Sequence, residues 1–150
     1  LAAVYGVLLR HPSAFAEPAV KARQPFDFIV AALRALGVTG GQIMDWPRDQ
    51  LLQVVVLPLG AMGQRWKSPP GPDGWPEEID SWITPQALAE RIGWAMRWPA
   101  TLVALPEPAT LAERALGDRA SAATTWAVVR AETRAEGVGL VFASPEFNRR

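Results

Sequence analysis

The acidic and aromatic side chains best suited to chemistry lie close together in the middle of the chain. They are Asp73, Trp75, Glu77, Glu78, Asp80 and Trp82. Aromatic rings stack on the apolar faces of sugars, and carboxylates accept hydrogen bonds from sugar hydroxyls. Two carboxylates held about 5 to 10 Å apart can also hydrolyse a glycoside, with Asp73 and Glu78 as the acid/base candidates. The group therefore predicts a glycan-binding or protein-binding surface or, as an alternative, part of a polysaccharide hydrolase.

The segment that carries these residues, 65–82, is predicted to be a long loop. Its four prolines and two glycines fix φ, remove backbone donors and permit turns, so it cannot form regular structure. Disordered linkers are normally poor in aromatic residues, whereas this loop contains Trp66, Trp75 and Trp82. The tryptophans would either present a binding surface or pin the loop onto a folded body. In the second case the loop is purely structural, a clamp that closes the core.

Other residues offer less chemistry. His11 is the only histidine, and we expect it to end a helix rather than to act in catalysis or bind a metal. The chain has no cysteine, its loop carboxylates do not follow the calcium-loop pattern, and the glycines at 37–41 lack the lysine of a phosphate-binding loop. We therefore expect no metal and no cofactor. Arg34 follows Asp27 on the same side of a predicted helix; it could clamp the loop or a ligand carboxylate, but a buried ion pair with Asp27 is the favoured interpretation.

Composition limits the remaining classes. Fifteen basic residues balance fifteen acidic ones, so no nucleic-acid partner is expected. The longest uncharged run, 50–64, is too short and too interrupted by Pro58 and Gly60 to span a bilayer. With 150 residues, 49% of them hydrophobic, the chain is expected to form a single domain.

Apolar periodicity and helix-end residues predict an all-α domain. Helices are expected over 25–36, from 47 to 64 with a kink or break at Pro58, and over 84–98, 108–116 and 121–136. Gly137 should end the last of these, followed by an apolar turn at 138–143 and a final helical turn at 144–147. In the helix over 84–98 the residues expected to face inward are Leu88, Ile92, Ala95 and Met96. The prediction is an irregular orthogonal bundle of about six or seven helices with one long loop.

The chain opens at Leu1 directly into apolar residues, without methionine or a basic leader. It is therefore interpreted as a C-terminal fragment of a longer protein. Its first ten residues would then have lost their packing partner, and the upstream region of the same protein is one expected partner.

Several segments together resemble a bacterial family called domain of unknown function 1800. They are residues 8–15 (Leu-Leu-Arg-His-Pro-Ser-Ala-Phe), 25–37, 62–64 leading into 69–75, 81–84, Arg91 and 143–147 (Ala-Ser-Pro-Glu-Phe). The resemblance spans nearly the whole chain and implies a helical module of a larger protein, exported or associated with the cell envelope. It also implies a role in handling surface polysaccharide, but no established activity and no set of catalytic residues.

Overall fold

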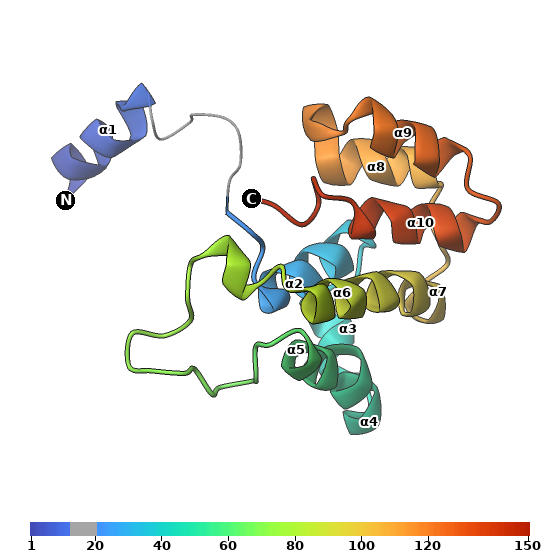
Figure 1. The fold of residues 1–150 in the computed structure, drawn as a ribbon, viewed down its shortest axis with the longest axis horizontal. Coiled ribbons are helices and arrows are strands. Elements are labelled where there is room, and N and C mark those ends of the chain that lie inside the picture. The colour runs from blue at the N-terminus through green and yellow to red at the C-terminus, as the bar shows by residue number, and fades with distance from the viewer. Residues whose placement is uncertain (13–20) are drawn as a thin grey trace.

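The computed structural model describes residues 1–12 and 21–150 and confirms the all-α fold (Figure 1). The helices are α1 (Ala2–Arg10), α2 (Pro25–Ala35), α3 (Gly40–Met44), α4 (Arg48–Leu51), α5 (Leu57–Ala61), α6 (Pro85–Arg97), α7 (Pro99–Leu102), α8 (Pro108–Leu116), α9 (Ala122–Val129) and α10 (Arg134–Ala143). A π-helical stretch, η2 (Leu52–Val56), joins α4 to α5, and the 3-10 turns η3 (Ile79–Ser81) and η4 (Gly117–Arg119) precede α6 and α9. Several helices have only four or five residues, so these segments outnumber the six or seven expected. Residues 13–15 of the first family-like motif lie outside the described part of the chain.

The core lies where α10 packs against α6 on one side and against α8 and α9 on the other (Figure 1). An aromatic cluster fills its centre. The ring of Phe28 lies 5.6 Å from that of Trp94 and 5.8 Å from that of Phe147, both edge to face, and Phe142 lies 5.0 Å from Phe147. All four side chains are buried. Edge-to-face packing at these distances adds to the free energy gained by removing the rings from water.

The helix is distorted one turn before Pro58, where a kink or break was expected, and the distortion is the π-helical stretch η2. Proline has no N–H with which to reach the carbonyl of Val54, four residues before it. The indole Nε1 of Trp94 donates to that carbonyl at 2.8 Å instead, from α6. The valine run at 54–56 therefore forms a wide π turn whose freed acceptor binds a neighbouring helix.

The helices begin where the sequence provides caps. Thr84 accepts a hydrogen bond from the Ala87 N–H at 3.1 Å, and Pro85 occupies the first turn of α6. The predicted inward face of this helix was wrong in part. The buried residues are Ala87, Arg91, Trp94 and Ala95. Ile92 and Met96 are 39% and 38% exposed, because a buried arginine turns the helix away from its most apolar stripe.

Arg91 fastens α6 to both ends of the folded body. Its guanidinium donates to the side-chain oxygen of Asn148 at 3.1 Å and to the Arg23 carbonyl at 2.7 Å, and it lies over the Phe28 ring. Complete burial lowers the pKa of Arg91 to about 10, so it stays charged at neutral pH. Its partners are neutral oxygen atoms.

The predicted helix over 121–136 was also wrong. α9 ends at Val129, and α10 begins after Thr133, whose hydroxyl accepts from the Glu136 N–H at 3.1 Å. Gly137 lies inside α10, which continues through the predicted apolar turn. A Cβ at Gly137 would come within 2.7 Å of the Pro108 ring, so the glycine allows α10 to approach α8. Ser144 accepts a hydrogen bond from the Phe147 N–H at 3.1 Å, and the Asn148 N–H donates to the Ser144 carbonyl at 3.2 Å, so the predicted final helical turn carrying Phe147 is present.

The N-terminal helix is the least packed element. α1 contains no buried residue and lies apart from the other helices (Figure 1). Its apolar side chains Val4, Tyr5 and Leu8 are 57 to 69% exposed. No helix in the described ranges is long and apolar enough to cross a membrane.

Candidate ligand pocket beside the Pro/Trp loop

The loop at 65–82 is fastened to the body through the carbonyl of Pro76. That oxygen accepts two hydrogen bonds, from the Trp82 indole at 2.8 Å and from the Gln24 side chain at 3.3 Å. The next residue, Glu77, pairs with Lys21 at 2.6 Å. The hydrogen bond and the charge of Lys21 lower the pKa of Glu77, although both side chains are well exposed. The loop is thus held at its C-terminal half by the segment that leads into α2.

Gln64 joins the other end of the loop to the same place. Its side-chain oxygen accepts from the Phe26 N–H at 2.7 Å, and its amide nitrogen donates to Gln24 at 3.1 Å. Phe26 lies in the first turn of α2, where backbone N–H groups have no partner within the helix. Gln64, which is only 7% exposed, therefore acts as a cap for α2 although it lies far from this helix in the sequence.

These contacts surround a cavity of about 330 Å³ between the start of α2 and the loop. It is lined by Gln24, Phe26, Asp27, Leu59, Gln64, Arg65, Trp66, Lys67 and Trp75. We call it the loop pocket. Its lining combines aromatic faces, two carboxamides and charges of both signs. Such a mixture suits a polar ligand with an apolar face.

The aromatic side of the loop pocket is built by Trp66 and Phe26. Their ring centroids lie 5.7 Å apart, and 51% of Trp66 is exposed to solvent. Lys67 follows with φ of 53°, the left-handed conformation that non-glycine residues seldom adopt, and no other non-glycine residue among those described has a positive φ. Such backbone strain costs on the order of 1 to 3 kcal/mol and is concentrated at functional sites.

The polar side of the loop pocket contains a single carboxylate among the described residues. It belongs to Asp27, which forms an ion pair with Arg150 at 2.6 Å. The expected buried pair between Asp27 and Arg34 was wrong, because Arg34 is exposed near the far end of α2. Arg34 therefore cannot clamp a ligand in this pocket.

The loop residues proposed from the sequence separate into three groups. Trp66 and Trp75 line the pocket, whereas Trp82 is 2% exposed and packs behind Trp75 with ring centroids 6.0 Å apart. Trp82 supports the site but offers no surface to a ligand. Asp73 lies at the tip of a turn closed by a hydrogen bond from the Gly74 N–H to the Gly71 carbonyl, and it is exposed outside the pocket. Glu78 is likewise exposed and absent from the pocket lining.

Three residues that form the wall of the loop pocket are Gln24, Phe26 and Gln64. Gln24 and Gln64 have no predicted role, and Phe26, which is 39% exposed, falls within the helix predicted over 25–36 without a role at the site. One sequence feature pointed to this place: Gln24 stands just before Pro25, at the start of a helix whose first backbone N–H groups need acceptors from outside the helix. Nothing in the sequence says that the acceptor comes from residue 64.

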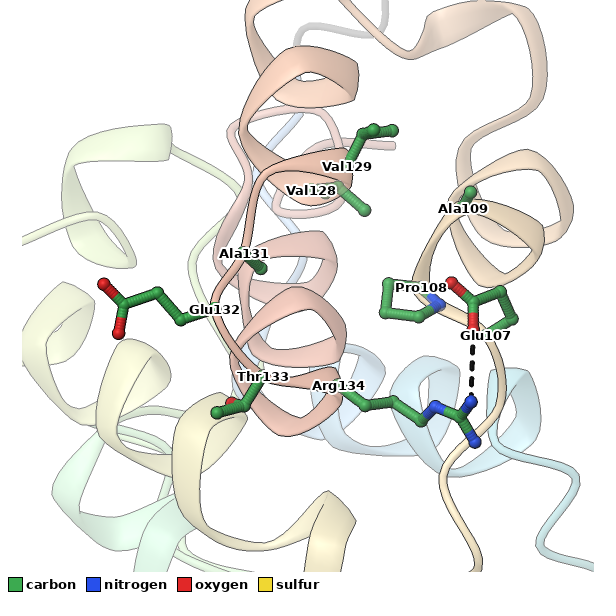
Figure 2. A pocket seen from close by; sticks show the side chains of 9 residues that line it. All are labelled: Glu107, Pro108, Ala109, Val128, Val129, Ala131, Glu132, Thr133 and Arg134. Atoms are coloured by element: carbon green, nitrogen blue, oxygen red, sulfur yellow. Dashed lines mark hydrogen bonds and ion pairs between the residues drawn. The ribbon is translucent and has the colours of Figure 1, made fainter.

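A second cavity, of about 270 Å³, lies between the starts of α8 and α10 and the end of α9 (Figure 2). Arg134 points across it toward Glu107, with nitrogen and oxygen 3.3 Å apart. The Thr133 hydroxyl and the Glu136 carboxylate at its edge cap the start of α10. Its lining contains no aromatic ring, so the loop pocket is the better site for a ligand with an apolar face. His11 follows the last residue of α1, and no group of three potential metal ligands occurs in the described ranges.

Comparison with known families decides the relationship of the chain. A family model described as a protein of unknown function, DUF1800, matches residues 1–149. This chain belongs to the DUF1800 family. Searches of characterised proteins and of solved structures found no match. The segments 25–37, 62–64 and 69–75 contribute Phe26, Asp27, Gln64 and Trp75 to the lining of the loop pocket.

Proposed function

We propose that this DUF1800 chain is a binding module that holds a glycan in the loop pocket, as part of a larger protein linked to the cell envelope. The observation that carries the proposal is the half-exposed ring of Trp66 beside Phe26, facing a cavity whose other side offers the amides of Gln24 and Gln64. A sugar ring presents an apolar face for an indole and hydroxyls for carboxamides. The pocket supplies both kinds of contact.

Binding fits this geometry better than hydrolysis does. A glycosidase needs two carboxyl groups on opposite sides of the scissile bond. The pocket lining has only the Asp27 carboxylate in the described residues, and Arg150 already neutralises it. The candidates Asp73 and Glu78 lie outside the pocket. A protein partner remains the second candidate, because Trp66 and Phe26 together form an exposed aromatic surface.

The proposal is tested with Trp66→Ala and a matched control, Trp126→Ala. Trp126 is 61% exposed on α9 and does not line the loop pocket, so both substitutions remove an exposed indole. Thermal unfolding is followed with and without a panel of soluble oligosaccharides. A sugar at 100 times its dissociation constant adds about 2.7 kcal/mol to the free energy of unfolding. For a domain of this size that corresponds to about 5 to 10 °C.

The wild type and Trp126→Ala should show this rise with one class of sugar, and Trp66→Ala should lose it. Without sugar, the unfolding temperature of Trp66→Ala should lie no more than a few degrees below that of the wild type, because half of the Trp66 side chain is already in water. Equal rises in both variants would place sugar binding elsewhere. A large loss of stability in Trp66→Ala alone would favour the purely structural loop.

A further inference from the structure

Basic residues gather where the two ends of the folded body meet. Residues 21–23 run antiparallel to residues 148–150: the Arg23 N–H donates to the Asn148 carbonyl and the Arg150 N–H to the Lys21 carbonyl, both at 2.8 Å. Arg119 reaches the same place and donates to the Arg149 carbonyl at 3.4 Å. Like charges held side by side repel, so this arrangement is destabilising unless opposite charges lie nearby.

The acidic side chains nearby neutralise only some of these basic residues. Glu77 pairs with Lys21 and Asp27 pairs with Arg150. In the described part of the chain, no carboxylate forms an ion pair with the other members of the cluster. These are Arg23, Arg119, Arg149 and the buried Arg91. The chain as a whole has no net charge, so the excess of positive charge is local.

Arg23 forms no side-chain hydrogen bond with another described residue, and the Nε atoms of both Arg23 and Arg91 are buried without an acceptor. The guanidinium of Arg23 lies 4.9 Å from the Phe147 ring. Burial lowers the pKa of Arg23 and the positive charge of Arg119 lowers it further, while the carboxylate of Asp27 offsets part of this effect. The terminal nitrogens of this guanidinium are not among the buried atoms, so they can donate charge-assisted hydrogen bonds to an anion.

We propose that the patch formed by Arg23, Arg119, Arg149 and Arg150 binds the acidic groups of the ligand, so that the glycan held by this module is an anionic polysaccharide. The proposal rests on the proposed function, and the geometry connects the two sites. The ion pair between Arg150 and Asp27 joins the patch to the lining of the loop pocket. A chain of sugars stacked on Trp66 can thus continue onto the arginines, which pair with carboxylate, sulfate or phosphate groups in a forked geometry.

The test compares hexamers of galacturonate with cello-hexaose, an uncharged hexamer, by isothermal titration. The wild type should bind the acidic hexamer about tenfold more tightly or better, the factor expected from one or more charge-assisted hydrogen bonds. This preference should shrink when salt is raised from about 20 to about 300 mM, because exposed charges are screened. Arg23→Gln and Arg119→Gln should each reduce the preference while keeping the affinity for cello-hexaose. Arg48→Gln, at an exposed position on α4, should leave both affinities unchanged.

The outcomes separate the two proposals. Equal affinity for both hexamers, with binding lost in Trp66→Ala, would overturn the anionic ligand and leave the glycan module intact. Arginine-dependent binding of galacturonate that is unaffected by Trp66→Ala would support the anion patch and overturn the loop pocket. A single-stranded oligothymidylate that binds where both hexamers fail would overturn both in favour of a nucleic acid. A preference unchanged in Arg23→Gln and in Arg119→Gln would place the anion site elsewhere, and binding by neither sugar would refute both proposals.

Discussion

Replacing Gln64 by leucine should destabilise the protein, because the Phe26 N–H would lose its acceptor. In the structure this N–H lies 2.7 Å from the Gln64 oxygen, and Gln64 is 7% exposed. A buried donor left without a partner costs roughly 1 to 3 kcal/mol. The lost bond to Gln24 adds less, since Gln24 is only partly buried and can bind water. Burying a leucine returns part of the loss, so the expected decrease in the free energy of unfolding is about 2 kcal/mol.

The effect can be measured by urea unfolding followed by circular dichroism. With a slope of about 2 kcal/mol per molar urea, the midpoint should fall by about 1 M. The matched control is Gln86→Leu, on the exposed side of α6, where the side chain only reaches Glu90 on the same helix. That variant should stay within about 0.5 kcal/mol of the wild type. If Gln64→Leu and Gln86→Leu have the same midpoint, Gln64 does not cap α2 and the account of the pocket wall fails.

Two further predictions concern the C-terminal half of the chain. Gly137→Ala should lower the free energy of unfolding by about 1 to 2 kcal/mol, because the new methyl group meets the rigid Pro108 ring. Gly93→Ala, at a position on α6 with open space around it, should raise the free energy of unfolding by about 0.5 to 1 kcal/mol. Both effects can be measured by thermal unfolding, and changes of the same sign in the two variants would contradict the packing argument. Burial alone would raise the pKa of Glu146, but hydrogen bonds from Ser121 and Thr124 outweigh it, and the pKa lies below its ordinary 4.5. A carboxyl group with a lowered pKa contributes stability above pH 4.5, and this stability is lost as the pH falls through the pKa of the folded state. The difference in free energy of unfolding between the wild type and Glu146→Gln should therefore be largest near about pH 7 and shrink below pH 4.5. Urea unfolding at several pH values measures it, and a difference that does not change with pH would contradict the prediction.

The sequence was informative wherever helix signals are local. Residues 108–116 were predicted as a helix and α8 has those bounds, because Pro108 starts it and Gly117, with φ of 56°, ends it. Gly137 carries the same signal to a reader of the sequence, yet it lies within α10. There the glycine allows α10 to approach α8 closely, and the sequence of α10 does not show which helix will pack against it.

The sequence indicates the loop at 65–82 but not the residues from elsewhere in the chain that line the pocket beside it. The tryptophans marked the segment, since so many prolines and glycines beside large rings require an anchored loop. Their division into a lining residue, Trp66, and a buried support, Trp82, depends on contacts with residues far away in the sequence. The same holds for Gln24, which reaches Pro76 across most of the first half of the chain. Arg91 illustrates the limit most clearly: hydropathy places a charged residue on the surface, but its hydrogen bonds to two distant oxygen atoms allow its burial.

The placement of Phe147 has a consequence for how the chain folds during synthesis. Its ring completes the cluster around Phe28, and the next residue, Asn148, accepts from Arg91. The first helix of the body therefore gains its full set of neighbours only after residues at the opposite end of the domain have left the ribosome. Contacts of such long sequence separation slow folding and leave apolar surface uncovered in the meantime. During that interval the apolar face of α2 remains in water, where it favours aggregation.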